Sequence, residues 1–375
     1  MSMTKETLHV FEAIAPYNQQ QIEEALQWLT TSNQFVQGVK YFYPTWSDAA
    51  VVEKLNSCNS CADFQVNFIE PMINSLIENS INKLEIKGLE GVCKVGNHLY
   101  ISNHRDIFLD SGLLQYTLYH RGYPFTEISL GDNLIIDEVI ERVAKLNNMF
   151  TVFRSGTKLE LLKNAKNLSA YLRHSIKQKK VSSWIAQGNG RAKDGFDKTF
   201  PGLVKMLLMS GSKDLKESIQ ELQIVISSVS YEYEPCALEK AVELQTKEKT
   251  GAYTKSKYEN INSIIKGIEE PKGDVCLHFE RLNVDNIDFS GDLKSTVIAI
   301  ATEMDRLVYK NYHLYKTNYM SYDLLYKVKE YSGFYNQEEL LAFSGYIQSQ
   351  SDNLDIQHRL LKIYANPVLN KKIRC

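Results

Sequence analysis

The chain has 375 residues, of which 43% are hydrophobic, so it can bury a large core as one extended domain or as two domains. Its 43 lysines and arginines against 45 aspartates and glutamates give a formal net charge of −2, which excludes a global positive field that would attract nucleic acid. No apolar run approaches the roughly 18 residues that a membrane-spanning helix needs, and the amino terminus lacks the apolar segment of a secretory signal. We therefore expect a cytoplasmic protein or one attached to a membrane surface.

The predicted elements begin with helices. Over residues 20–80, "QQIEEALQWL" and "FQVNFIEPMINSLIENSI" place apolar residues at helical spacing, and no strand is predicted before about residue 92. Within this region Cys58 and Cys61 form a CxxC pair. A zinc site would need a second pair of ligands, and a thioredoxin-like site would need a preceding strand, so we interpret the pair as incidental.

After residue 92, short apolar runs alternate with amphipathic segments, which indicates strands alternating with helices. The predicted strands are "HLYIS", "FTEISL", "MFTVF", "VSSWIA", "IVISSVSY" and "DVCLHF". From about residue 290 onward, "LKSTVIAIATEMDRLVY" and "NQEELLAFSGYIQ" indicate helix again. The predicted fold class is α/β, with a single mixed sheet and flanking helices. We expect a helical N-terminal region (1–85), an α/β domain (86–285) and a helical C-terminal extension (286–375).

The stretch "YISNHRDIFLDS", residues 100–111, places an imidazole where a strand gives way to a helix. His104 would lie at the carboxyl edge of the sheet, where open α/β proteins form their sites. A helix N-terminus disfavours imidazolium there, and a neutral histidine can act as a general base. Asp110 is the candidate for holding the proton on the other ring nitrogen. The alternative is a capped helix start, with Asn103 or Asp106 as N-cap and His104 as an ordinary turn residue.

Three further predicted strands end in polar or cationic residues. "MFTVFRSGT" ends in Arg154, "IAQGNGRAKDG" in a glycine-rich loop with Arg191 and Lys193, and "IVISSVSYEYEP" in Tyr231 and the residues after it. A guanidinium grips phosphate or carboxylate in a bidentate manner, and glycines allow close backbone approach to an anion. The loop matches neither a P-loop nor GxGxxG, and no GxSxG elbow is present. Together these segments indicate a neutral base beside an anion-binding rim.

These segments resemble the four ordered blocks of the glycerolipid acyltransferase superfamily, the glycerol-3-phosphate and lysophosphatidate acyltransferases. "SNHRDIFLDS" is similar to the first block, "MFTVFRSG" to the second, "IAQGNGRAKDG" to the third and "IVISSVSYEYEP" to the fourth. The resemblance spans roughly residues 85–285. Two positions depart from the pattern. Five residues instead of four separate His104 from Asp110, so Asp106 is an alternative partner. Gln187 or Asn189 stands where the third block has an acidic residue, which would weaken or repurpose the acceptor site.

The resemblance implies transfer of a fatty acyl group from acyl-CoA or acyl-carrier protein to a hydroxyl of glycerol 3-phosphate or a lyso-lipid such as lysophosphatidate, in phospholipid biosynthesis. No metal or other cofactor is implied. His104 would act as base and Asp110 would orient it, while N–H groups at the start of the next helix could stabilise the oxyanion. The residues implied in acceptor binding are Arg154, Gly188, Gly190, Arg191 and Lys193. One alternative acceptor is an amino-acid-derived lyso-lipid, and a second alternative is a non-catalytic membrane-surface or carrier-binding relative.

Such acceptors reside in a bilayer, so peripheral attachment to the inner face of the cell membrane is also implied. Three segments are candidates for that attachment because aromatic and basic residues favour membrane interfaces. They are the apolar residues 201–210, the basic residues 177–180 and the tyrosine-rich residues 309–326. The ordinary alternatives are a core helix, a solvated turn and C-terminal packing, and the basic run could instead dock an acidic carrier protein.

Overall fold

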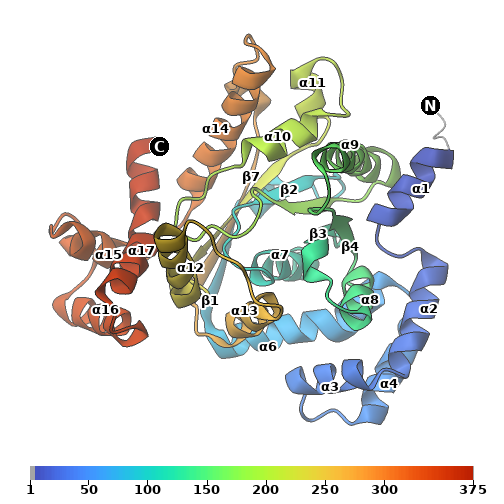
Figure 1. The fold of residues 1–375 in the computed structure, drawn as a ribbon, viewed down its shortest axis with the longest axis horizontal. Coiled ribbons are helices and arrows are strands. Elements are labelled where there is room, and N and C mark those ends of the chain that lie inside the picture. The colour runs from blue at the N-terminus through green and yellow to red at the C-terminus, as the bar shows by residue number, and fades with distance from the viewer. Residues whose placement is uncertain (1–4, 375) are drawn as a thin grey trace.

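A seven-stranded mixed sheet forms the centre of the molecule, a computed structural model that describes residues 5–374 and the side chains of residues 10–372 (Figure 1). The strands are β1 (Ile81–Lys87), β2 (Leu99–Ser102), β3 (Glu127–Gly131), β4 (Met149–Val152), β5 (Ser183–Ala186), β6 (Val225–Tyr231) and β7 (Gly273–Arg281). Their order across the sheet is β1-β7-β6-β2-β5-β3-β4. β6, β2, β5, β3 and β4 are parallel, whereas β7 is antiparallel to β6 and parallel to β1. The loops after β2, β4, β5 and β6 therefore leave the sheet at one edge.

Helices surround this sheet and extend from it at both ends of the chain. They are α1 (Lys5–Ile14), α2 (Gln19–Thr30), α3 (Asn33–Phe42), α4 (Asp48–Asn56), α5 (Cys61–Phe64), α6 (Glu70–Ser80), α7 (Leu109–His120), α8 (Glu138–Leu146), α9 (Lys158–His174), α10 (Pro201–Leu208), α11 (Leu215–Gln220), α12 (Ala237–Thr250), α13 (Glu259–Glu269), α14 (Leu293–Asn311), α15 (Lys316–Tyr326), α16 (Gln337–Gln350) and α17 (Leu354–Arg374).

Two hydrophobic cores cover the two faces of the sheet. Leu99 and Ile101 of β2 pack with α9, α10 and α14, whereas Tyr100 between them packs with α6 and α7. This alternation follows from the period of two in a strand, whose successive side chains point to opposite faces. Helices cover both faces of the sheet at β2, which explains why all four residues of this strand are buried.

The terminal helices form two additional groups on opposite sides of the sheet (Figure 1). Near the N-terminus, α2 to α5 build their own small core, to which Val139 and Leu146 of α8 contribute. Near the C-terminus, α15, α16 and α12 share a core with α17, which contributes Leu360, Ile363 and Tyr364. The predicted fold class, an α/β mixed sheet with helical termini, is confirmed, and all six predicted strands are present.

One prediction about the elements is wrong, because β1 lies before residue 92. Among the strands that the structure describes, this one pairs with β7 alone, and Ile81 is its one buried residue. An edge strand that stays half-exposed can keep polar residues along its length, so "INKLEIK" lacks the apolar run that marks the other strands. The first predicted domain boundary, residue 85, falls inside β1, and the division into three domains stays a prediction.

Two of the three segments considered for membrane attachment are largely packed into the protein, whereas the basic run is exposed and engaged in ion pairs. Residues 201–210 include α10, whose apolar side chains lie in the core with α9 and α14. In the basic run, Lys177 pairs with Glu221 at 2.7 Å and Lys179 pairs with Glu127. In residues 309–326, four tyrosines are buried, namely Tyr309, Tyr312, Tyr315 and Tyr322. Among the described helices, none combines the length and the apolar character needed to cross a bilayer.

Candidate active site

His104 lies in the loop between β2 and α7, at the carboxyl edge of the sheet. Its Nδ1 is 2.9 Å from Oδ2 of Asp110, in the first turn of α7. The imidazole is 13% exposed and the carboxylate is fully buried. An ionised carboxylate only accepts hydrogen bonds, so in a neutral imidazole this contact places the proton on Nδ1 and leaves a lone pair on Nε2. This is the tautomer in which a histidine can accept a proton from a hydroxyl group.

The Asp110 carboxylate is fixed from three other directions. Its Oδ2 accepts hydrogen bonds from the backbone N–H groups of Arg105 at 2.6 Å and Asp106 at 2.9 Å. Its Oδ1 accepts the hydroxyl of Tyr231, the last residue of β6, at 2.9 Å. Burial, together with the nearby Asp110 charge, raises the pKa of Tyr231 well above its usual value, so the tyrosine stays a neutral donor. Four donors therefore hold one carboxylate, and the position of His104 follows from them.

Asp106 has a different position and does not contact the imidazole through any described hydrogen bond. Its Oδ1 accepts the N–H groups of Phe108 and Leu109, both at 2.9 Å, as a residue that caps the start of α7 does. Burial, with the Asp110 charge, raises the pKa of Asp106. Of the two carboxylates, Asp110 is thus the partner of His104.

Stabilisation of the oxyanion by N–H groups at the start of α7 stays a prediction, and four of the N–H groups there are already engaged. Those of Arg105 and Asp106 donate to Asp110, and those of Phe108 and Leu109 donate to Asp106. These four donors are engaged by carboxylates, which bind N–H groups more strongly than a neutral carbonyl does. They are therefore not free to face a reacting group.

Side-chain and backbone hydrogen bonds fix the His104 loop to both neighbouring strands. The side chain of Asn103 exchanges two hydrogen bonds with the backbone of Val229 in β6, at 2.9 and 2.8 Å. On the other side, the N–H of Gln187 donates to Ser102 at 2.8 Å, and the N–H of Ala192 donates to the carbonyl of His104 at 2.7 Å. The glycine-rich loop after β5 thus lies directly beside His104, as the order β6-β2-β5 requires.

A buried charge cluster, which the sequence did not reveal, connects these loops. Arg105 is fully buried, and its guanidinium donates to both carboxylate oxygens of Asp197, at 2.8 and 2.6 Å, and to Glu234 at 3.1 Å. Lys240 of α12 contacts the same Glu234 and donates to the backbone carbonyl of Arg105 at 2.6 Å. The partners come from 92 to 135 residues away in sequence, so only the tertiary fold brings them together. We call these four residues the Arg105 cluster.

A cleft of about 570 Å³ lies between the glycine-rich loop, His104 and α14. Three of its lining residues are more than nine-tenths buried and carry a polar atom without a hydrogen-bond partner in the described chain. These atoms are Oε1 of Gln187, Nη1 of Arg191 and Oγ1 of Thr199. Buried polar groups are nearly always paired, so these three donors and acceptors indicate a surface prepared for a polar ligand. Arg191 Nη2 is held by Ser263 at 3.3 Å, which leaves Nη1 to contact such a ligand.

The two glycines of the loop have different requirements. Gly190 has φ of +96°, a conformation that side chains rarely adopt, and no atom lies near the place of its absent Cβ. Gly188 shows no such conformation, and a Cβ there would make only ordinary contacts, the nearest at 3.9 Å. Both glycines line the cleft, as does the exposed Asn189 between them. The backbone shape thus requires glycine at Gly190 alone.

Two other predicted residues lie outside this cleft. Lys193 pairs with Glu243 of α12 at 3.1 Å and does not line the cleft. Arg154 follows β4, three strand positions away from β2, which is roughly 14 Å at the usual strand spacing. It lines a second pocket of about 270 Å³, between the sheet edge, α9 and α10. The two pockets share Gly188, Asn189 and Phe200 in their walls.

The second pocket is mainly apolar. Its apolar lining residues are Ile14, Val152, Phe153, Leu161, Ala165, Leu168, Ile185, Ala186, Phe200, Leu203 and Met206.

Among the described residues, no group of three or more His, Cys, Asp or Glu side chains is arranged to hold a metal ion. The site therefore combines a base, a cationic cleft and an adjoining apolar pocket.

No protein-family profile matches the chain, and no curated protein matches its sequence. Among solved structures, it is similar to the 1-acyl-sn-glycerophosphate acyltransferase PlsC from Thermotoga maritima, with a TM-score of 0.37, 14% identity, and coverage of 76% of this chain and 97% of PlsC. The signal recognition particle receptor FtsY from Elizabethkingia anophelis matches with a TM-score of 0.23, 10% identity, and coverage of 80% and 97%. At these TM-scores, neither likeness bears on activity.

Proposed function

We propose that the protein is an acyltransferase that moves a fatty acyl group from a thioester to the hydroxyl of an anionic acceptor. The observation that supports this most strongly is the hydrogen-bonded pair of His104 and Asp110 beside the unpaired Nη1 of Arg191 in one cleft. A base with a free lone pair next to a cationic donor suits a substrate with a hydroxyl and an anion a short distance apart.

The proposed reaction uses His104 twice. Nε2 accepts the proton of the acceptor hydroxyl while its oxygen attacks the thioester carbonyl carbon. The C–S bond then breaks, and the imidazolium returns its proton to the leaving thiolate. Asp110 stabilises the imidazolium between these steps, because its carboxylate already accepts the proton-bearing Nδ1.

The two pockets suit the two parts of such a substrate pair. Arg191 would hold the anion of the acceptor in the cleft, and the apolar pocket would take part of the acyl chain, since burial of methylene groups is favourable. The acceptor we propose is glycerol 3-phosphate or lysophosphatidate, and the donor is acyl-CoA or acyl-carrier protein. A carboxylate acceptor, as in an amino-acid-derived lyso-lipid, would meet the same guanidinium.

A product analysis tests this proposal. Purified protein is incubated with labelled acyl-CoA or acyl-carrier protein and, separately, with glycerol 3-phosphate, lysophosphatidate or a lyso-aminolipid, and the product is identified by mass spectrometry. We expect an ester product with a phosphorylated acceptor. The absence of acyl transfer to every acceptor from both donors would overturn the proposal and favour a non-catalytic role.

A further inference from the structure

The outward face of α9 has an unusual composition for a helix on the surface of a protein. The helix packs on the sheet through Leu168 and Leu172, which belong to the core. Two leucines near its start, Leu159 and Leu162, are instead 77% and 54% exposed. A three-residue spacing places these two leucines on one face, where polar residues are usual.

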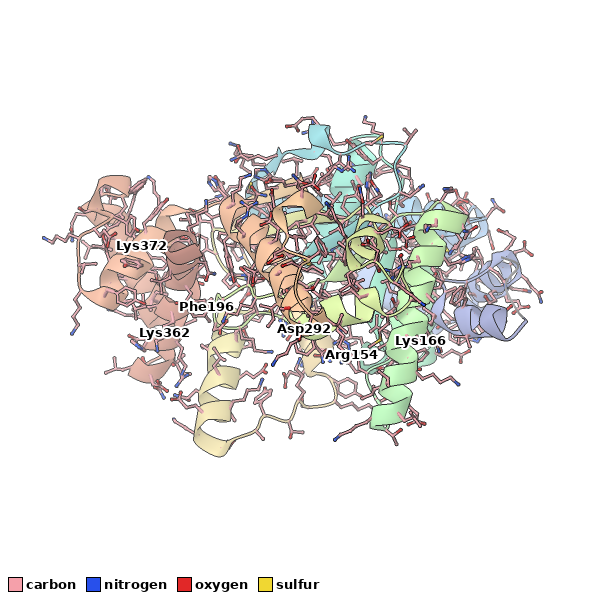
Figure 2. The ribbon with its side chains drawn as sticks, turned by 90° about the horizontal axis from the view of Figure 1, so that it is seen from above. Arg154, Lys166, Phe196, Asp292, Lys362 and Lys372 are labelled. Atoms are coloured by element: carbon pink, nitrogen blue, oxygen red, sulfur yellow. The ribbon has the colours of Figure 1, made fainter. Side chains whose placement is uncertain are left out.

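Cationic residues continue this face. Lys163 and Lys166, four residues after each leucine, are exposed and lie on the same side of the helix. Arg154, just before α9, is also exposed and lies at the same end of the molecule (Figure 2). The acidic residue of this turn, Glu160, is engaged by Thr157, whose N–H and hydroxyl donate to it at 2.7 and 2.8 Å. The face therefore combines exposed apolar groups with net positive charge.

The exposed apolar groups extend to the mouths of both pockets. Phe153 and Leu161 line the apolar pocket, Ile298 lines the cleft that contains His104, and Phe200 lines both. Their side chains are between 36% and 55% exposed. An acyl chain that lay against this collar could enter the apolar pocket without crossing water, which is favourable because its methylene groups would stay in apolar surroundings.

A second cationic projection lies on the same side of the molecule. α12 and α9 both project toward the lower edge of the view in Figure 2. The loop that follows α12 carries Lys255 and Lys257 together with Tyr258, which is 54% exposed. Tyrosine and lysine side chains favour the headgroup region of a bilayer, where an apolar body and a polar tip are both satisfied.

We infer that this surface, formed by the start of α9, the collar of the pockets and the loop after α12, docks on an anionic lipid bilayer. The inference deepens the proposed function by naming the partner of the same site. Exposed leucines beside lysines fit a bilayer, because its acyl region takes up the leucines and its anionic headgroups attract the lysines. An acidic carrier protein would explain the lysines but not leucines that project into water.

Co-sedimentation with vesicles tests the inference without any turnover. The full chain is mixed with vesicles of phosphatidylcholine and phosphatidylglycerol in equal parts, or of phosphatidylcholine alone. We expect stronger binding to the anionic vesicles. The double variant Leu159→Ser/Leu162→Ser should bind the anionic vesicles at least roughly tenfold more weakly than the wild type. The variant Lys163→Glu/Lys166→Glu should lose affinity on a similar scale. Neither pair lines a pocket, so folding and chemistry should be retained.

A matched control is available in the C-terminal helices. Leu341 and Leu354 are 63% and 77% exposed, so Leu341→Ser/Leu354→Ser removes similar apolar area outside the docking surface. This variant should bind vesicles as the wild type does. Equal binding by wild type and Leu159→Ser/Leu162→Ser, or equal loss in the control, would overturn the inference. The inference would also be overturned if Lys163 and Lys166 bound an acidic carrier protein and the chain did not bind vesicles.

The outcome is independent of the proposed chemistry. Transfer to glycerol 3-phosphate from a short-chain acyl-CoA that stays in solution should be the same in the wild type and in Leu159→Ser/Leu162→Ser. Loss of vesicle binding with retained soluble turnover supports the docking surface. Absence of soluble turnover in the wild type would count against the proposed function and would leave the vesicle result to decide the docking surface by itself.

Discussion

The His104 side and the Arg191 side of the cleft differ in how completely their polar groups are paired. Around His104, the Asp110 carboxylate accepts four hydrogen bonds and the Arg105 guanidinium donates to two carboxylates, and among these residues and Asp106 only Oδ2 of Asp106 is buried without a partner in the described chain. Along the glycine-rich loop and its continuation, Gln187, Arg191 and Thr199 each keep a buried polar atom without a partner in the described chain. Paired groups rigidify a site, whereas unpaired ones carry a desolvation cost that a ligand can offset. The comparison assigns orientation to the first side and ligand binding to the second.

The largest expected effect concerns the Arg105 cluster. Arg105→Ala leaves Asp197 and Glu234 buried and lacking the guanidinium, so we expect a loss of about 3–5 kcal/mol in the free energy of unfolding. As control, Lys216→Ala breaks an exposed pair with Asp285 and should cost less than about 1 kcal/mol. Chemical denaturation of both variants measures the difference. Similar stability of the two variants would mean that this side of the cleft is not held by its paired charges.

Substitution of the two aspartates near His104, Asp110 and Asp106, should reduce the rate of acyl transfer to different extents. Asp110→Asn replaces the acceptor of Nδ1–H by an amide, so we expect acyl transfer to fall by roughly a hundredfold or more. Asp106→Asn keeps a carbonyl oxygen that can accept from the N–H groups of Phe108 and Leu109, so the rate of acyl transfer should fall less in this variant. Steady-state kinetics on folded variants decides the order. A greater loss in Asp106→Asn would transfer the orienting role to Asp106.

On the unpaired side, Arg191→Ala should act on binding of the acceptor. Removal of a charge-assisted contact costs about 1.5–3 kcal/mol, so we expect the KM for a phosphorylated acceptor to rise roughly tenfold or more, with little change for the acyl donor. Arg191→Lys should recover only part of the lost acceptor binding, because an ammonium group cannot make the bidentate contact that a guanidinium makes. Lys193→Ala is the comparison, because Lys193 pairs with Glu243 outside the cleft. An unchanged acceptor KM in Arg191→Ala would exclude Arg191 from anion binding.

The smallest effect is a change in pH dependence. Burial raises the pKa of Asp106, so the folded state binds this proton more tightly than the unfolded state does. Stability due to Asp106 is therefore lost as the pH rises above the unfolded pKa of about 4. Asp106→Asn removes this titration, so its stability relative to the wild type should increase between about pH 4 and pH 7. Parallel stability curves, measured by denaturation across this range, would contradict the assignment.

The sequence was sufficient for the fold class and for six of the seven strands, because hydrophobic periodicity separates strands from helices, but it did not indicate the half-exposed edge strand β1. It was also sufficient to single out His104 and Asp110, since both lie within one short loop and helix start. The Arg105 cluster could not be predicted, because Asp197, Glu234 and Lys240 come from distant loops and α12, and an arginine next to a histidine has no distinctive spacing. The contact between Tyr231 and Asp110 could not be predicted either, because the two residues are 121 positions apart in the sequence.

For Arg154 and Lys193, the order of residues along the chain did not determine whether each would line the cleft that contains His104. Both residues follow predicted strands. Arg154, however, follows β4, which is an edge strand of the sheet, and Lys193 pairs with Glu243 on α12. A carboxyl edge several strands wide accommodates more than one pocket, and strand order is a property of the tertiary structure. Their part in substrate binding stays a prediction, as does that of Gly188, Gly190 and Arg191.

The central claim is that His104 acts as the base of an acyl transfer, and the rate of transfer in His104→Ala tests it most directly. His120→Ala is the matched control, because His120 is an exposed histidine on α7 that pairs with Glu70 away from the cleft. With both variants shown to be folded by circular dichroism, we predict a roughly 10²–10⁴-fold loss of turnover in His104→Ala and wild-type turnover in His120→Ala. Turnover near the wild-type rate in a folded His104→Ala protein would contradict the mechanism.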